Sequence, residues 1–173
     1  MIAGQGTVGL ELAAQAQAQG ARLDAVVAPC SGGGLVGGIA LALTGASPGM
    51  AVYAAEPQGF DDLQRSLAAG ERQRNDPAAR SVCDALLAPM PGVLTFAIAR
   101  RHLAGSLVVA DDEAMQAMAV AFGDFKLVAE PSGAAALAAI LAGRIALAGR
   151  TVAAVLSGGN VDPAMFAAAL ARG

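Results

Sequence analysis

Hydrophobic residues occur along the chain in two kinds of run. Short β-branched or apolar runs, typical of buried strands, alternate with longer Ala- and Leu-rich runs, typical of helices. The pattern predicts strands at 24–29, 51–55, 106–110 and 151–156. It predicts helices at 7–19, from a turn at 31–34 to about 42, at 61–69, at 93–103, from 111 or 112 onward, at 133–142 and at 163–171. This alternation predicts an α/β fold, a parallel sheet with helices on both faces.

Polar residues beside these runs suggest where the helices begin and end. Thr7 is a candidate N-cap for the first helix, and Gly20 would end that helix. Asp111 or Asp112 is the candidate cap of the helix after the third strand. The polar stretch at 70–92 is a long connection, and connections of that length in compact domains are usually functional or mobile.

The composition is that of one globular domain over residues 1–173. The chain is 55% hydrophobic and 14% charged. Intrinsically disordered chains show the opposite balance, so disorder is excluded. A chain of 173 residues is long enough to bury a substantial core.

Charge and cysteine content exclude several other classes. The net charge is −3, the arginines are scattered and Lys126 is the only lysine, so we expect no nucleic-acid partner. The longest apolar stretch, 35–43, is far shorter than the ~20 residues that span a bilayer, so we expect no membrane partner. Cys30 and Cys83 form neither a disulfide framework nor a metal-ligand spacing, which favours a reducing, cytoplasmic location.

The segment PCSGGGLVGG at 29–38 joins a predicted strand to a predicted helix. Consecutive glycines let backbone N–H groups converge at a helix start, which is a geometry suited to phosphate. The segment is neither a Walker A loop nor a GxGxxG fingerprint, because its spacing differs from both. A tight turn that packs strand against helix explains the glycines equally well.

A second glycine segment, VLSGGN at 155–160, follows the last predicted strand. The hydroxyl of Ser157 is placed either to bind a ligand ring or to cap the next helix, and by itself the cap is favoured. A nucleophile elbow is excluded, because GxSxG needs a glycine where Val155 stands.

Acidic residues mark two further loops. Glu56 and Asp62, within EPQGFDD, could bind a hard cation through oxygen atoms. A solvated loop in which Asp61 or Asp62 caps a helix is the simpler interpretation. Glu130 precedes Pro131 at a predicted helix start, where it could complement the helix dipole or lie beside a ligand loop.

Taken together and in order, these segments resemble the fold-type II pyridoxal-phosphate (PLP) enzymes, above all the serine/threonine dehydratases (threonine ammonia-lyases) and serine racemases. The resemblance covers nearly the whole chain. It rests on six blocks: IAGQGTVGLEL (2–12), PCSGGGLVGGIA (29–40), VYAAEPQGFDD (52–62), SVCDALL (81–87), KLVAEPSGAAALAA (126–139) and VLSGGNVD (155–162). It implies a tryptophan-synthase-β-like fold, of which this chain is the C-terminal part of the large domain.

The resemblance also implies roles for individual residues. The loop that holds the PLP phosphate matches Ser31, Gly32, Gly33, Gly34 and Leu35. The residue that hydrogen-bonds the pyridine nitrogen matches Ser157, and its loop is completed by Gly158, Gly159 and Asn160. The glutamate near the cofactor pocket matches Glu130. A site for Mg²⁺ or another divalent cation matches Glu56, the Phe60 carbonyl and Asp62.

The implied activity is β-elimination from L-threonine or L-serine to a 2-oxo acid and ammonia. PLP stores the electrons of the substrate α-carbon. A serine at the ring nitrogen makes the cofactor a weaker electron sink than an aspartate would, which suits elimination. Two alternatives stay open: serine racemisation in the complete enzyme, and a non-catalytic phosphate- or PLP-binding remnant.

The chain departs from the family pattern in two places. None of its residues matches the lysine that carries the cofactor, because Lys126 belongs to the KLVAEPSG block. Ala85 stands where the family usually has glycine, and the resemblance implies that its loop approaches the cofactor face, where an added methyl group could crowd the cofactor. We therefore expect the chain alone to be inactive, and to form a homo-oligomer or pair with a complementary N-terminal fragment.

Overall fold

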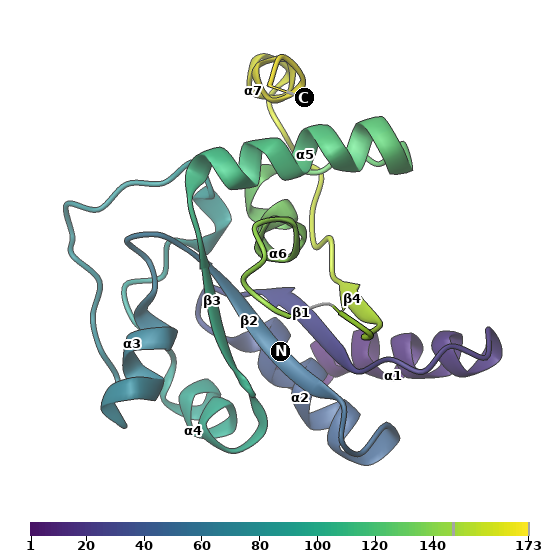
Figure 1. The fold of residues 1–173 in the computed structure, drawn as a ribbon. Coiled ribbons are helices and arrows are strands. Elements are labelled where there is room, and N and C mark those ends of the chain that lie inside the picture. The colour runs from purple at the N-terminus through teal and green to yellow at the C-terminus, as the bar shows by residue number, and fades with distance from the viewer. Residues whose placement is uncertain (147, 173) are drawn as a thin grey trace.

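A four-stranded parallel sheet forms the centre of the computed structural model, which describes residues 1–146 and 148–172 (Figure 1). The strands run in the order β3-β2-β1-β4. Their bounds are β1 (Ala25–Pro29), β2 (Ala51–Pro57), β3 (Gly105–Val109) and β4 (Val152–Ala154). The α/β class expected from the sequence pattern is confirmed.

The path of the chain across the sheet changes direction once. The chain moves outward from β1 to β2 to β3 and then returns to place β4 on the other side of β1. Val26 of β1 pairs with Val52 of β2 and with Ala153 of β4. The loops after β1 and β4 therefore leave the same edge of the sheet next to each other, at a topological switch point.

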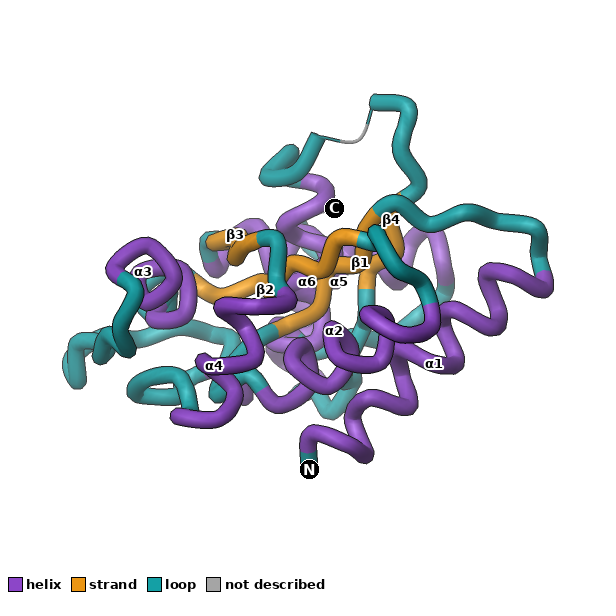
Figure 2. Tube along the Cα trace, turned by 90° about the horizontal axis from the view of Figure 1, so that it is seen from below, coloured by secondary structure: helices purple, strands orange, loops and turns teal. Residues whose placement is uncertain are grey.

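Helices cover both faces of the sheet (Figures 1 and 2). One face carries α1 (Ile2–Ala18), α2 (Gly34–Ala46), α3 (Asp62–Ala69) and α4 (Val93–His102). The other carries α5 (Asp111–Phe125), α6 (Pro131–Leu141) and α7 (Pro163–Leu170). Alternate residues of β1 enter two separate cores, Val26 with Ile39 of α2 and Val27 with Met118 of α5. A central strand buried on both faces explains the continuous apolar run in the sequence.

Two predicted N-caps are wrong. The first helix begins at Ile2, so Thr7 lies inside it and its hydroxyl donates to the Gly4 carbonyl at 2.8 Å. The N-cap of α5 is Ala110, whose N–H donates to the Glu113 carboxylate, while Asp111 lies in the first turn. Polar residues in a first turn compete for the cap, and here tertiary contacts decide: Asp111 accepts a hydrogen bond from Ser81 instead.

Two further boundaries differ from the pattern. Helix α6 begins at Pro131, two residues before the predicted start, because proline is pre-organised for the first helical turn. Strand β4 spans only Val152–Ala154 of the predicted 151–156. It lies at one edge of the sheet and pairs with β1 alone, so its ends lack a second partner.

Helices α1 and α2 cross at glycines. Gly6 and Gly9 of α1 are buried against Gly38 and Ile39 of α2. A Cβ atom on Gly38 would lie 2.5 Å from the Ile2 carbonyl oxygen and 2.8 Å from the Gly6 nitrogen. The two backbones are thus too close for any side chain at Gly38, which brings the start of α1 beside the start of α2.

The long connection at 70–92 is ordered by side chains. It contains a short 3₁₀ helix, η1 (Asp84–Leu86). Asn75, 5% exposed, donates to the Ala88 carbonyl at 2.8 Å and to Asp62 Oδ1 at 2.5 Å. Arg72 donates to the Pro91 carbonyl at 3.1 Å. These bonds tie the connection to itself and to the start of α3, and the Ala88 N–H donates to Ser31 Oγ at 3.2 Å, which joins it to the loop after β1.

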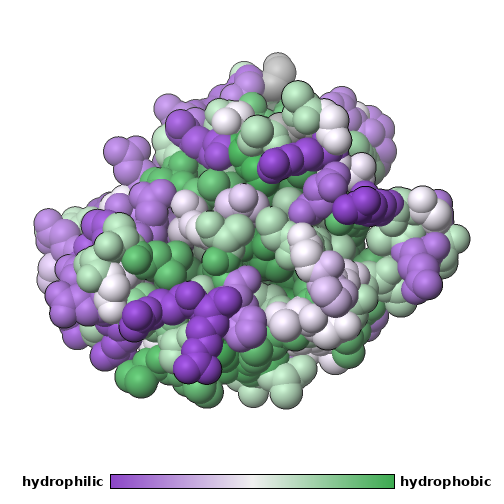
Figure 3. Space-filling model, turned by 60° about the horizontal axis from the view of Figure 1, so that its bottom comes forward, coloured by the Kyte–Doolittle hydropathy of each residue, from purple (hydrophilic) through white to green (hydrophobic). Residues whose placement is uncertain are grey.

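The surface is mixed in polarity. Figure 3, with the layer of α1 to α4 turned forward, shows hydrophobic side chains that reach the surface between hydrophilic ones. Within residues 1–146 and 148–172, no helix has the length and apolar character needed to cross a membrane.

Candidate functional site

A cleft of about 630 Å³ opens where β1 and β4 end, at the switch point of the sheet. Seven residues singled out from the sequence line it: Ser31, Gly32, Gly33, Gly34, Leu35, Glu130 and Ser157. The loop after β1 and the loop after β4 are far apart in the sequence, yet they face one space because β1 and β4 are neighbours in the sheet. The structure therefore brings the two glycine segments together.

The glycine loop supplies backbone donors to this cleft. Gly33 is the N-cap of α2 and has a φ of 87°, a left-handed conformation that favours glycine. Helix α2 then starts at Gly34, and its first-turn N–H groups have no acceptor inside the helix. A Cβ atom on Gly32 would meet nothing within 4 Å, so this side of the loop faces open space. Free amides at a helix start, beside an open face, form an anion site.

The second glycine segment is fixed by α6. Glu130, the N-cap of α6, donates its N–H to the Gly158 carbonyl at 3.1 Å, and the Ser157 N–H donates to the Gly133 carbonyl at 3.4 Å. A Cβ atom on Gly158 would collide with the Glu130 carboxylate. Close backbone contact thus holds Ser157 at the rim of the cleft.

The remaining residues of this segment do not line the cleft. Gly159 approaches the Val128 carbonyl, where a Cβ atom would lie at 2.5 Å, and Asn160 is exposed. Gly158, Gly159 and Asn160 are not among the residues that line the cleft in the described part of the chain. Their contacts are those of a support for Ser157.

Ser132 organises the opposite wall. This buried residue donates from its hydroxyl to Asp84 Oδ1 at 3.3 Å and accepts from the Ala85 N–H at 3.0 Å. The two bonds hold η1 against α6, and Ala85 and Leu86 line the cleft there. Ala85 therefore lies at the wall of the cleft.

Glu56, Phe60 and Asp62 lie together at the end of β2 and the start of α3, outside the cleft. Glu56 is fully buried and accepts from the Leu63 N–H at 2.8 Å, the Gln64 N–H at 2.9 Å and the Ser106 hydroxyl at 2.6 Å. Burial raises the pKa of Glu56 from 4.5 to about 7, although these hydrogen bonds oppose the rise. Glu56 thus caps α3 as well as facing Asp62.

Asp62 differs from Glu56 in having a free oxygen. Its Oδ1 accepts from Asn75, but its buried Oδ2 has no hydrogen-bond partner among the residues that the structure describes. Burial raises the pKa of Asp62, against the effect of the Asn75 bond. An orphaned buried carboxylate oxygen fits a cation. Within the described residues, no group of three or more His, Cys, Asp or Glu side chains is placed to hold a metal, so a cation here would depend on carbonyl oxygens.

Some residues of the cleft were missed from the sequence. Met1, Ile2, Gln5, Thr95 and Ser132 also line it. Gln5 and Ser132 lie within the blocks IAGQGTVGLEL and KLVAEPSGAAALAA, so their positions inside these blocks could have identified them. Thr95 lies in an ordinary amphipathic helix, and no local signal marks it.

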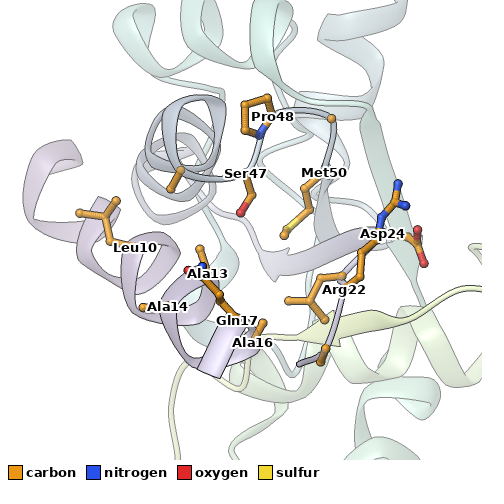
Figure 4. Close-up of a pocket in the computed structure, with 14 residues that line it drawn as sticks. Leu10, Ala13, Ala14, Ala16, Gln17, Arg22, Asp24, Ser47, Pro48 and Met50 are labelled. Carbon is orange, nitrogen blue, oxygen red and sulfur yellow. The ribbon is translucent and has the colours of Figure 1, made fainter. Parts of the chain in front are cut away.

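A second cavity, of about 550 Å³, lies at the opposite edge of the sheet (Figure 4). It is bordered by the end of α1, the turn after α2 and the residues before β1, among them Arg22 and Asp24. Ligands of parallel sheets bind at the carboxyl ends of the strands, whereas this cavity lies at the amino ends. The chemistry is therefore expected at the first cleft.

The family model for pyridoxal-phosphate dependent enzymes matches residues 1–158 of the chain. The chain belongs to this family. It is 40% identical over 165 residues to a serine racemase of Dictyostelium discoideum, an alignment that covers 94% of this chain and 49% of the racemase. It is 41% identical over 162 residues to a β-hydroxyaspartate dehydratase of Paracoccus denitrificans (strain Pd 1222). That alignment covers 94% of this chain and 50% of the dehydratase.

Solved structures agree with this assignment. A threonine deaminase from T.th. superposes with a TM-score of 0.88 at 42% identity, covering 93% of this chain and 57% of the deaminase. A maize serine racemase superposes with a TM-score of 0.86 at 36% identity, and the match covers 99% of this chain and 52% of the racemase. The expected fold-type II PLP fold is confirmed. The chain spans about half the length of the curated relatives it matches.

Proposed function

We propose that this chain is the cofactor-cradling, C-terminal portion of a PLP-dependent L-threonine/L-serine dehydratase. The observation that carries the proposal is that the glycine loop after β1 and Ser157 after β4 line one cleft. Its volume, about 630 Å³, lies in the range of small-molecule and cofactor sites. The relatives include both dehydratases and racemases that carry the same half of the fold.

The residues present fit a phosphorylated cofactor. The first-turn amides of α2, next to the open face of Gly32, would hold its phosphate. The hydroxyl of Ser157 would donate to its ring nitrogen. When bound, PLP supplies an electron sink for the α-carbon of an amino acid. A serine hydroxyl, unlike a carboxylate, leaves that nitrogen unprotonated, and the weaker sink favours loss of the β-hydroxyl over transamination.

Lys126 does not fit the role of a cofactor lysine. It is exposed at the C-cap of α5, its ammonium group donates to the Gly123 carbonyl, and it does not line the cleft. We therefore propose that the chain alone is inactive, that a complementary N-terminal half must supply the lysine, and that the chain forms a homo-oligomer where that half is absent. Exposed apolar side chains support such pairing: Val93, Leu94, Phe125, Leu127 and Val128.

We further propose that Mg²⁺ or another divalent cation binds beside Asp62, with Glu56 and the Phe60 carbonyl as further ligands. The free Oδ2 atom of Asp62 supports this proposal. Cys30 and Cys83, which are buried and form no disulfide with each other, support a cytoplasmic location.

Calorimetry with PLP and with pyridoxal, which lacks the phosphate, tests the cradle. PLP should bind the purified chain, and pyridoxal should bind at least tenfold more weakly, since the α2 amides contact only the phosphate. Absence of PLP binding would overturn the proposal that the cleft is a cofactor site.

Turnover is tested by co-expressing the chain with the N-terminal half of the similar Dictyostelium serine racemase. The reconstituted enzyme should release ammonia from L-serine or L-threonine, and Ser157→Ala should lower the rate by at least tenfold. Absence of ammonia release from both substrates would overturn the proposed dehydratase role.

A further inference from the structure

Thr95, in the first turn of α4, joins this helix to the glycine loop. Its hydroxyl donates to the Gly32 carbonyl at 2.5 Å, a contact between residues 63 positions apart in the sequence. The Gly92 N–H approaches the same carbonyl at 3.4 Å. The carbonyl of Gly32 is thus anchored to the start of α4 by two donors.

The side chain of Thr95 lies between two glycines. A Cβ atom on Gly33 would lie 2.9 Å from Thr95 Cβ, and a Cβ atom on Gly92 would lie 2.8 Å from Thr95 Oγ1. Neither position has room for a side chain while Thr95 keeps its place. Gly33 is therefore glycine for two reasons, its positive φ of 87° and the contact with Thr95.

Anchoring the Gly32 carbonyl fixes the plane of the peptide between Gly32 and Gly33. This peptide is trans, so its carbonyl and its N–H point in opposite directions, the carbonyl toward α4 and the N–H away from it. The orientation of that plane determines how the chain enters α2 at Gly34. It consequently determines where the first-turn amides of α2 point.

We propose that Thr95 is a positioning residue for phosphate, whose hydroxyl holds the glycine loop in the conformation in which the α2 amides converge on a phosphate monoester. This inference rests on the proposed cofactor role of the cleft. If the glycine loop holds the phosphate-binding conformation for only part of the time, the apparent affinity for the phosphate falls in proportion to that fraction. Loss of a single neutral hydrogen bond makes the competent conformation several-fold rarer.

Two variants separate the hydroxyl from the shape of the side chain. Thr95→Val keeps the branched shape that fits between Gly33 and Gly92 but removes the donor, and Thr95→Ser keeps the donor. Thr44→Val is the matched control, because Thr44 Oγ1 also joins α2 to α4, through His102 Nδ1 at 3.1 Å, and lies away from the cleft. The Thr44→Val substitution loosens the contact between α2 and α4 at the ends of these helices that lie away from the cleft.

The measurement is the dissociation constant of PLP and of pyridoxal for the purified chain by calorimetry, with the thermal midpoint of each apo variant. Thr95→Val should weaken PLP about 5-fold, on the order expected for one hydrogen bond, and leave pyridoxal unchanged. Thr95→Ser and Thr44→Val should bind PLP as the wild type does. A purely structural role for Thr95 would weaken both ligands equally or neither.

The outcomes distinguish this inference from the proposed function. If the wild type binds PLP and Thr95→Val binds it equally well, or loses pyridoxal to the same extent, Thr95 has no positioning role and the cofactor site stands. If the wild-type chain does not bind PLP, the cofactor site and the role of Thr95 both fail.

Discussion

The crossing of α1 over α2 allows a sharp test, because two adjacent glycines of α2 differ in what surrounds them. Gly38 faces the backbone of α1, and a methyl group there would lie 2.5 Å from the Ile2 carbonyl oxygen. Gly37 faces the side chain of Ile98, and a methyl group would lie 3.6 Å from its Cγ2 atom, an ordinary contact. Both lie in the same helix, and neither has a positive φ.

The two substitutions to alanine should therefore have opposite effects. Each gains about 1 kcal/mol of helix propensity. Gly38→Ala must also push α1 away or distort its first turn, an overpacking strain of roughly 1–3 kcal/mol. Gly37→Ala should be neutral or stabilising by up to about 1 kcal/mol. Because the propensity gain cancels in the comparison, the difference between the variants measures the strain, on the order of 1–3 kcal/mol.

Urea denaturation followed by circular dichroism gives the free energy of unfolding of both variants and the wild type. Gly38→Ala should have a lower midpoint than Gly37→Ala, with an unchanged slope. Equal midpoints would show that α1 is not closely docked on α2 in solution. The position of Met1, Ile2 and Gln5 at the cleft would then be wrong as well, since that contact places them there.

Three further predictions follow from single contacts. Asp162→Ala should destabilise the chain by about 1 kcal/mol in urea denaturation, because the Asp162 carboxylate caps α7 by accepting from two backbone N–H groups. Asp162→Asn should lower the free energy of unfolding by less. Mn²⁺ should raise the thermal midpoint of the wild type and of Asp61→Asn but not of Asp62→Asn, and an equal shift in Asp62→Asn would exclude Asp62 as a ligand. Burial raises the pKa of the Cys83 thiol from 9.0 to about 11. The unfolded state therefore loses this proton at a lower pH than the native state does, and the free energy of unfolding falls as the pH rises from 9 to 11. The stability advantage of the wild type over Cys83→Ala should shrink by roughly 2–3 kcal/mol across that window, and a constant advantage would contradict the raised pKa.

The two glycine segments illustrate how far local sequence leads. Each could be placed at the end of a strand from its pattern alone, and both strands occur there. Neither segment by itself favoured a ligand over a turn or a cap. The N-caps at Thr7 and Asp111 were misjudged because several nearby polar residues satisfy the same local rules, and tertiary partners such as Ser81 select among them.

The acidic loop shows a similar limit. The spacing of Glu56 and Asp62 is compatible with a cap and with a cation site. In the structure Glu56 caps α3 through the Leu63 and Gln64 amides, while Asp62 keeps a free oxygen. Sequence spacing could not predict these contacts, because they depend on which oxygen of each carboxylate meets a donor from another element.

The sequence by itself determined the parallel α/β class, the glycine turns and the family, since these depend on periodicity, on backbone conformations open to glycine, and on the order of short blocks. Only the tertiary structure decided that β4 returns beside β1, and this return makes two separate loops into one cleft. It also decided that Thr95 meets Gly32 across 63 positions of sequence. Contacts of this kind follow from the packing of whole helices and strands, so they cannot be predicted from local sequence patterns.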